Sequence, residues 1–373
     1  MPPTVPSVKL NNGHSMPAFG LGTWQMDEAE AETAVKQAID LGYRHFDTAF
    51  IYHNEVAIGK AVRQKIKENV VKREDIFIVS KLWNTCHAKS EVLPACRRSH
   101  TYLSLDYIDL YLVHWPFGLK SKTESRNPQV FDGFDDTSLE DTWREMEKCV
   151  DQGLVRSIGL SNFNSLQVDR IIKIARIKPV CNQIEVHVGF HQQKLIHHCR
   201  QKSVEVVGYC PLGAPNRPVK RRNEKSVLDQ PAVMQIASVH GKTPAQVALR
   251  YLLIHHCRQK SVEEVGYCPL GAPNRPVKRR NEKSVLDQPA VMQIASVHGK
   301  ILAQVALRYL VQLGVTPIPK SNTTQHMKDN INIFDFKLSE EEMTELDKLN
   351  TDERVMLYPL ARHHTEWPFK IPF

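Results

Sequence analysis

The sequence lacks the features that mark secreted, membrane-spanning or disulfide-stabilised proteins. Its first residues, MPPTVPSVKLNNG, contain neither a basic segment nor an apolar core, so they do not look like a secretory leader. No apolar run reaches the ~20 residues that a bilayer-spanning helix needs. The eight cysteines form no CxxC pair, and Cys257 and Cys268 only repeat Cys199 and Cys210. We therefore expect a cytoplasmic protein with free thiols, not bound to a membrane.

Patterns for metal and nucleic-acid binding are also missing. His197, His198 and Cys199 are adjacent, and successive residues of a helix point in different directions, so they cannot converge on one ion. The net charge of +8 suggests a nucleic-acid partner, but no binding signature accompanies the basic run between Arg217 and Lys225. We expect that run to be a solvated loop, with no metal ion and no nucleic acid bound.

Two adjacent segments of the chain are almost identical. Residues 195–252 and 253–310 are each 58 residues long, and the second carries five of the eight net positive charges. The three differences are Val206 against Glu264, Thr243 against Ile301, and Pro244 against Leu302. A solenoid contains several diverged copies, whereas this unit occurs twice and resembles nothing else in the chain. We interpret it as a recent tandem duplication or a gene-model artefact, in which one copy is surplus to a 315-residue protein.

Short apolar runs alternate with longer amphipathic segments. A hairpin is predicted around Asn12 and Gly13. Strands are then predicted at GLGTW, YRHFDTA, IFIVSKLW, IDLYLVHWP, VRSIGLSNF, VCNQIEVH, VEVVGYCPLG and GVTPIPKS. Helices are predicted at 28–41, 55–68, 90–103, 139–152, 165–176, 192–202 and 303–313, with a polar loop at 120–137.

This alternation predicts a parallel sheet with helical crossovers. Eight units in about 315 residues suit a closed (β/α)₈ barrel, here a single domain over residues 1–373 with a surplus segment. A doubly wound sheet is the alternative fold, but GLGTWQ lacks the third glycine of its dinucleotide-binding fingerprint.

The two copies compete for the seventh strand and the helix after it. Barrel strands are buried on both faces, so VEVVGY of the first copy suits the strand better than VEEVGY with Glu264. Thr243 and Pro244 also form a better helix start than Ile301 and Leu302. Only the second copy's helix leads directly into the last strand, however. A hybrid therefore stays open, with the surplus as a surface insertion whose closure entropy grows slowly with length.

Function in a barrel gathers at the C-terminal ends of the strands. Polar or aromatic residues stand at these ends, namely Trp24, Asp47, Lys81, His114, Ser161, Asn162, Gln183, Glu185, Tyr209 and Lys320. A complete ring of such residues is hard to explain by packing alone.

Four of these side chains suggest proton chemistry. A phenol has a pKa near 10 and is a poor acid at neutral pH. An ammonium such as Lys81 would lower the pKa of Tyr52, and Asp47 would hold that ammonium in place. His114 could orient a carbonyl group. The set predicts Tyr52 as a general acid that protonates a developing alkoxide.

The segments GLGTW, GYRHFDTAFIYHNE, SKLW, DLYLVHWP, IGLSNFN, NQIEVH, YCPLG and IPKS resemble the aldo-keto reductase superfamily, in its branch of aldose and aldehyde reductases and hydroxysteroid dehydrogenases. The resemblance covers the chain outside the extra copy. It implies a monomeric barrel that reduces aldehydes or ketones with NADPH. In its pattern Tyr52 is the proton donor, Asp47 and Lys81 tune it, and His114 orients the carbonyl.

The resemblance also implies which residues bind the cofactor. For the nicotinamide, Ser161, Asn162 and Gln183 match the carboxamide contacts, and Tyr209 matches the residue that stacks on the ring. For the rest of the cofactor, Leu212 and Gly213 match the pyrophosphate loop, Lys320 and Ser321 match the 2′-phosphate site, and Asn330 matches an adenine contact. The remaining predicted cofactor contacts are Thr23, Trp24 and Asp47. His326 stands where the family usually has Arg. Loss of that Arg weakens bidentate phosphate recognition, so NADH stays an alternative cofactor.

The predicted substrate pocket is apolar and aromatic. Its residues are Trp24, Tyr52, Trp83, His114, Trp115 and Trp367, and the C-terminal EWPFKIPF resembles the loop that sets substrate range. The carbonyl substrate itself stays open among sugars, steroids, prostaglandins and lipid aldehydes. The alternative function is a catalytically impaired barrel that binds the cofactor or serves a structural role, because the extra copy disturbs the pyrophosphate loop.

Overall fold

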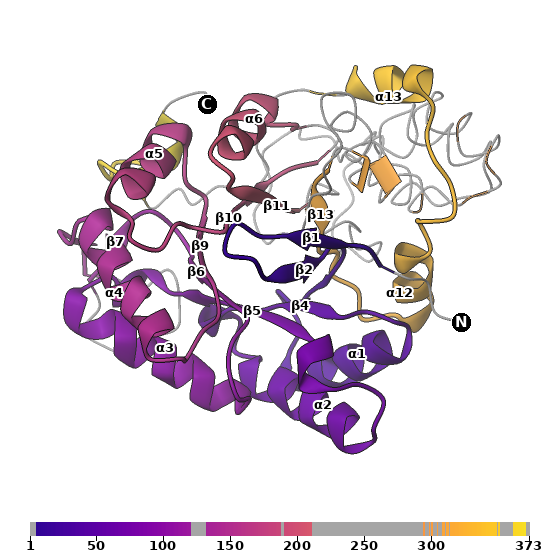
Figure 1. The fold of residues 1–373 in the computed structure, drawn as a ribbon, viewed down its shortest axis with the longest axis horizontal. Helices are drawn as coiled ribbons and strands as arrows, with labels where there is room; N and C mark the ends of the chain where they lie inside the picture. Colours follow the sequence, from indigo (N-terminus) through magenta and orange to yellow (C-terminus); the bar gives the residue numbers. More distant parts are fainter. Residues whose placement is uncertain are drawn as a thin grey trace, which may run out of the picture.

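An eight-stranded parallel sheet forms the centre of the protein (Figure 1). The computed structural model describes residues 5–120, 132–187, 190–210, 314–348, 350 and 361–370, with eight further residues, namely Ile294, His298, Lys300, Gln304, Arg308, Tyr309, Val311 and Gln312. The strand order is β13-β11-β10-β9-β6-β5-β4-β3. The strands are β3 (Leu21–Gly22), β4 (His45–Asp47), β5 (Phe77–Leu82), β6 (Leu110–Val113), β9 (Ile158–Ser161), β10 (Cys181–Glu185), β11 (Glu205–Tyr209) and β13 (Thr316–Pro317).

The sheet closes on itself between its first and last strands. A parallel bridge joins Gly22 to Lys320. The Gly20 N–H donates to the Pro317 carbonyl at 3.0 Å, and the Gly22 N–H donates to the Pro319 carbonyl at 3.1 Å. The predicted barrel is therefore confirmed, and the doubly wound alternative is wrong, because an open sheet keeps two free edges.

Helices surround the sheet (Figure 1). They are α1 (Glu28–Asp40), α2 (Glu55–Lys67), α3 (Lys89–Leu103), α4 (Leu139–Asp151), α5 (Ser165–Ile174), α6 (Gln193–Gln201), α12 (Thr324–Ile331) and α13 (Glu340–Asp347). Side chains of Asp27, Ser138 and Asn164 accept hydrogen bonds from the first turns of α1, α4 and α5, which fixes where these helices begin. The helices predicted between residues 28 and 202 agree with these bounds to within two residues.

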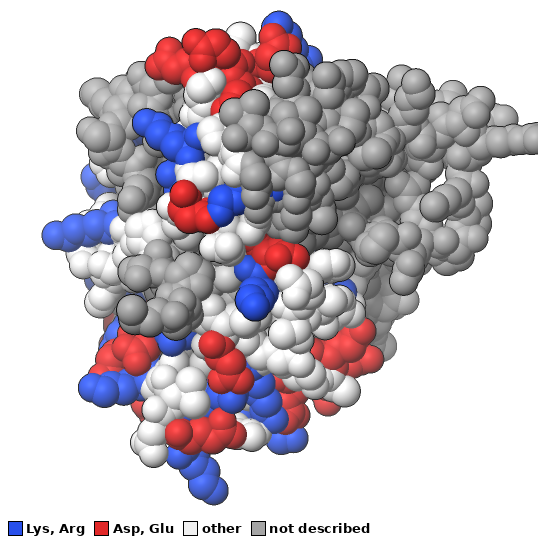
Figure 2. Space-filling model, turned by 90° about the vertical axis from the view of Figure 1, so that its right-hand side faces the viewer, with Lys and Arg blue, Asp and Glu red and all other residues white. Residues whose placement is uncertain are grey.

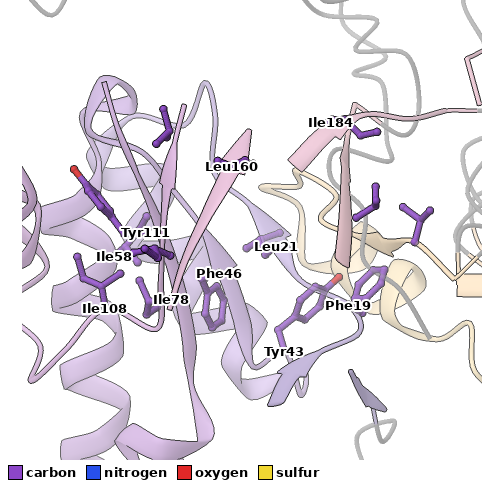
Figure 3. Packing of buried hydrophobic residues seen from close by; sticks show 14 of the residues in the cluster. Phe19, Leu21, Tyr43, Phe46, Ile58, Ile78, Ile108, Tyr111, Leu160 and Ile184 are labelled. Carbon is purple, nitrogen blue, oxygen red and sulfur yellow. The ribbon is translucent and has the colours of Figure 1, made fainter. Parts of the chain in front are cut away.

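The barrel strands are apolar on both faces. Ile78, Tyr111 and Leu160 pack outward against the helices, as Figure 3 shows. Val79 and Leu112, which follow Ile78 and Tyr111 in β5 and β6, pack in the separate cluster inside the barrel. Because successive side chains of a strand point to opposite faces, a continuous apolar run supplies side chains both to the layer under the helices and to the barrel interior.

An N-terminal hairpin closes one end of the barrel. Strands β1 (Ser7–Lys9) and β2 (Ser15–Pro17) pair antiparallel, and Gly13 adopts a φ of 88° in the turn. Asn11 Nδ2 donates at 2.9 Å to the carbonyls of Pro179 and Ser203, which precede β10 and β11. The predicted hairpin is confirmed. It covers the N-terminal end of the barrel, so we expect the functional site at the opposite, C-terminal ends of the strands.

Four elements depart from the prediction. A short antiparallel pair, β7 (Gly118–Leu119) and β8 (Phe134–Asp135), lies at the ends of the predicted polar loop. Strands of two residues give no periodic signal. Helices α12 and α13 follow the last strand and were not predicted, although Ser339 and Glu342 form a capping box at the start of α13.

The seventh strand and the packing after it come from different copies of the duplicated segment. Strand β11 belongs to the first copy, and its fully buried Val206 pairs with Asn182 of β10. From the second copy, Ile294 and Tyr309 are buried in the cluster beneath the helices, and Tyr309 donates to Asp347 Oδ1 at 3.2 Å. This arrangement matches the hybrid alternative. Residues 211–293, with the basic run and Glu264, lie outside the described residues, and the surplus stays a prediction.

Glu205, at the start of β11, gives a stability prediction. Its Oε2 is buried and has no hydrogen-bond partner among the residues that the structure describes, and burial raises the pKa of the carboxyl to about 7, with Arg200 counteracting. A raised pKa means that the folded state binds the proton more tightly, so stability falls as pH rises from about 4.5 to 7. Glu205→Gln should therefore add about 1–3 kcal/mol to the free energy of unfolding at pH 8 and almost nothing at pH 4.5. Urea unfolding at both pH values measures this. An equal change at both would contradict it.

Candidate active site

The four predicted catalytic residues converge at the C-terminal end of the barrel. Asp47 ends β4, Lys81 lies in β5, His114 follows β6, and Tyr52 ends the short helix η1 (Phe50–Tyr52). Lys81 Nζ donates to Asp47 Oδ1 at 2.5 Å and to the Thr48 carbonyl at 2.8 Å. The same Nζ lies 5.0 Å from the centroid of the Tyr52 ring. The Tyr52 and His114 rings meet edge to face at 5.8 Å.

Asp47 and Lys81 form an ion pair with no exposed side-chain surface. Burial raises the pKa of the Asp47 carboxyl, and the Lys81 ammonium and the Gln183 amide counteract this. A buried pair is tolerated only when further hydrogen bonds complete it, which the Thr48 carbonyl and Gln183 supply. The arrangement fixes a positive charge beside a phenol, where it favours the phenolate.

His114 is neutral in this setting. Burial, and then the charge of Lys81, hold its pKa well below the usual range for histidine. The ring also contacts Trp83, with centroids 5.3 Å apart. A neutral imidazole can donate one hydrogen bond but carries no extra proton. The geometry therefore suits Tyr52, and not His114, as the proton donor.

Asn162 connects two other predicted cofactor residues to His114. It follows β9 in a left-handed conformation with φ 65°, which asparagine tolerates better than most residues. Its Nδ2 donates to the His114 carbonyl at 2.9 Å and to Ser161 Oγ at 3.2 Å. The Tyr209 hydroxyl donates to its Oδ1 at 2.5 Å. Ser161, Asn162 and Tyr209 thus lie together beside His114.

The residues after β13 fit the adenosine half of a dinucleotide. Asn330, on α12, is fully buried, and neither polar atom of its carboxamide finds a hydrogen-bond partner in the described part of the chain. Such an orphan costs free energy, and the edge of a purine base offers the matching donor and acceptor. Lys320 and Ser321 precede α12, and His326 is exposed on it. Leu212 and Gly213 lie outside the described residues.

Aromatic side chains gather next to His114. Trp83, Trp115 and Trp367 share one buried cluster with Phe50. The rings of Trp115 and Trp367 are almost parallel, with centroids 6.2 Å apart, although the residues come from distant parts of the sequence. Five of the six predicted pocket residues therefore lie in or beside this cluster. Trp24 instead packs, partly buried, against the barrel interior.

Asn54 supports the site and was missed by the sequence prediction. Its Nδ2 donates to the carbonyls of Thr23 (2.9 Å) and Met26 (3.1 Å), and its Oδ1 accepts from Thr48 Oγ1 at 2.7 Å. It therefore ties the loop after β3 to the loop that carries Tyr52. Asparagine just before a helix indicates an N-cap, but here the side chain makes no cap hydrogen bond to α2. Nothing local in the sequence distinguishes the two roles.

The described residues hold neither a metal-binding cluster nor a membrane-spanning helix. They contain no group of three or more His, Cys, Asp or Glu side chains that could hold a metal ion, and their helices are too short or too polar to cross a membrane. Lys and Arg are interspersed with Asp and Glu on the described part of the face in Figure 2. That part carries no continuous basic stripe.

Comparison with known proteins gives consistent matches. The model of the Aldo/keto reductase family matches residues 16–262 and 253–351, two segments that overlap where the second copy begins. Aldo-keto reductase family 1 member A1-A of Danio rerio is 37% identical, over 98% of this chain and 99% of that protein. Member A1 of Bos taurus is 35% identical, over 98% of both chains. The structure of the aldose reductase from Schistosoma japonicum aligns with a TM-score of 0.73 at 37% identity, covering 98% of this chain and 99% of that one.

Proposed function

The chain belongs to the aldo/keto reductase family, and on that premise we propose that it reduces aldehydes or ketones to alcohols, with NADPH as the reductant and Tyr52 as the proton donor. The observation that carries this proposal is the buried Asp47–Lys81 pair, held 5.0 Å from the Tyr52 ring and beside a neutral His114.

Different residues of the chain would perform the separate steps of carbonyl reduction. When bound, the nicotinamide supplies a hydride to the carbonyl carbon. His114 donates a hydrogen bond to the carbonyl oxygen and orients it. Tyr52 gives its proton to that oxygen as negative charge develops there, and Lys81 stabilises the phenolate that remains. The cluster of Trp83, Trp115 and Trp367 provides an apolar surface for the substrate.

A turnover assay tests the proposal. Purified protein should oxidise NADPH when an aromatic aldehyde is added, and a fluorescence titration should show saturable NADPH binding. Binding without turnover on any member of an aldehyde and ketone panel would instead favour the alternative, an impaired barrel that only binds the cofactor. The intact set of Asp47, Tyr52, Lys81 and His114 supports the active enzyme. The monomeric state and the cytoplasmic location stay predictions.

Preference for NADPH over NADH depends on the 2′-phosphate. Lys320 and Ser321 are the proposed contacts, and His326 lies exposed on α12. A guanidinium there would bind a phosphate through two parallel hydrogen bonds, which imidazole cannot do. His326→Arg should therefore lower the KM for NADPH by about 10-fold and leave the KM for NADH unchanged. Initial rates with both cofactors measure this, and equal changes in the two KM values would contradict the assignment.

A further inference from the structure

Gln183 reaches across the barrel to the catalytic carboxylate. It lies in β10, whereas Asp47 ends β4, and strands β9, β6 and β5 separate them in the sheet. Gln183 Nε2 nevertheless donates to Asp47 Oδ2 at 2.8 Å, and the Gln183 side chain is almost fully buried. The hydrogen bond therefore joins opposite sides of the barrel wall through its interior.

The Asp47 carboxylate depends on this contact. Its Oδ1 accepts a hydrogen bond from Lys81 and its Oδ2 accepts one from Gln183, so within the described part of the chain each oxygen has one side-chain donor. A carboxylate in the barrel interior keeps its charge and its orientation only while such donors are present. Lys81 contacts Asp47 on one side and the Tyr52 ring on the other. A change at Asp47 Oδ2 is therefore transmitted to the charge beside the phenol.

The same side chain also lies next to the proposed nicotinamide contacts. Gln183 is in register with Ser161 of β9, and the Asn162 N–H donates to the Gln183 carbonyl at 2.9 Å. A glutamine carboxamide has two N–H donors and one oxygen acceptor, so the bond to Asp47 uses only one of its groups. The remaining N–H and the oxygen can contact a carboxamide on the cofactor.

We propose that Gln183 is a positioning residue for proton transfer, which fixes Asp47, and through it Lys81, opposite Tyr52, so that one side chain serves both the nicotinamide contact and the proton donor. The inference rests on the proposed function and adds to it a link between cofactor binding and the acid. Without the Gln183 donor, Asp47 Oδ2 becomes more basic and draws the Lys81 proton toward itself. Less positive charge then remains at Tyr52, which keeps its proton to higher pH.

Three neighbouring ionisable groups, His45, His114 and Cys181, keep one protonation state near neutral pH. Burial lowers the pKa of His45 on β4 to about 4 and holds that of His114 well below its usual range, and the charge of Lys81 adds to both effects. Burial raises the pKa of the Cys181 thiol on β10 well above its usual value. These three groups therefore do not produce the basic limb of the pH profile, which we assign to Tyr52 together with Asp47 and Lys81.

The test compares Gln183→Leu with Ser161→Ala as a matched control. Both variants remove a proposed carboxamide contact, but only the first removes the donor to Asp47. Gln183→Leu should move the basic limb of kcat for aldehyde reduction to higher pH and lower kcat at pH 7 by about 10-fold at saturating NADPH. Ser161→Ala should weaken NADPH binding, measured by fluorescence quenching, and leave the limb in place. An unmoved limb in Gln183→Leu, with weaker NADPH binding only, would overturn the proposal.

A second readout separates this inference from the proposed function. Ultraviolet difference titration of tyrosinate in the cofactor-free protein, with Tyr52→Phe subtracted, measures the ionisation of Tyr52 without turnover. If the unmodified protein reduces no carbonyl compound, the proposed function fails, and this titration still decides the role of Gln183. A higher Tyr52 midpoint in the variant supports it, and an unchanged midpoint rejects it. Gln183→Asn, which keeps the carboxamide one methylene short of Asp47, replaces the Leu variant if that does not fold.

Discussion

Tyr52→Phe is expected to lower kcat for aldehyde reduction by about 10²–10⁴-fold, the usual contribution of a positioned general acid. The hydroxyl is the only group that the substitution removes, so the ring should keep its contacts with Lys81 and His114. Affinity for NADPH should change by less than about twofold, because a group that acts only in the transition state does not alter binding of the ground state. Steady-state rates with an aromatic aldehyde, together with a fluorescence titration, measure both quantities.

A tyrosine at the opposite end of the barrel supplies the control. The Tyr107 ring lies against the guanidinium groups of Arg73 and Arg156, 3.9 and 3.4 Å from its centroid. Tyr107→Phe also removes one phenol hydroxyl, but far from the catalytic residues, and should retain kcat. Full turnover in Tyr52→Phe would show that another group donates the proton.

Deleting one 58-residue copy, such as residues 253–310, is expected to raise the melting temperature by about 5 °C. In a domain of this size, that corresponds to an increase of about 2 kcal/mol in the free energy of unfolding. Two near-identical segments offer the same strand and helix for one place in the barrel, so we expect alternative arrangements to compete with the native one. Without the surplus there is a single seventh strand and a single helix after it. NADPH binding should be at least as tight as in the full chain. Thermal melts and cofactor titrations of both forms measure these effects.

Comparing two deletions of equal length tests which copy provides the better start for the helix after the seventh strand. Deleting 253–310 joins Leu252 to Val311, whereas deleting 211–268 joins Cys210 to Pro269, and both leave 315 residues. Both products keep Val206 in β11. They differ only in whether the next helix starts with Thr243 and Pro244 or with Ile301 and Leu302. The Thr–Pro product should be more stable by about 1 kcal/mol, because it restores an N-cap and a first-turn proline. If both products were less stable than the full chain, the second copy would be an integrated part of the fold.

The sequence alone determined the barrel and the ring of polar strand ends. Strand runs that are apolar throughout and helices with one apolar face are local patterns, so β5, α4 and most other elements lie where they were predicted. Placing Asp47, Lys81 and His114 in one site needed only the rule that parallel strands bring their C-terminal ends together. Elementary pKa arguments gave these residues their proposed roles, and the motif resemblance implies the same roles.

Only the tertiary structure decided how distant residues share one contact. Local sequence favoured Val206 of the first copy for the seventh strand but left open which copy packs after it, and only the structure shows that Tyr309 of the second copy does so. The bond from Gln183 to Asp47 joins residues 136 positions apart in the sequence. A glutamine on a buried strand looks the same in sequence whether it faces a cofactor, a carboxylate or both. That choice depends on which side chains the closed barrel places opposite it, because hydrogen-bond partners are selected by distance in space.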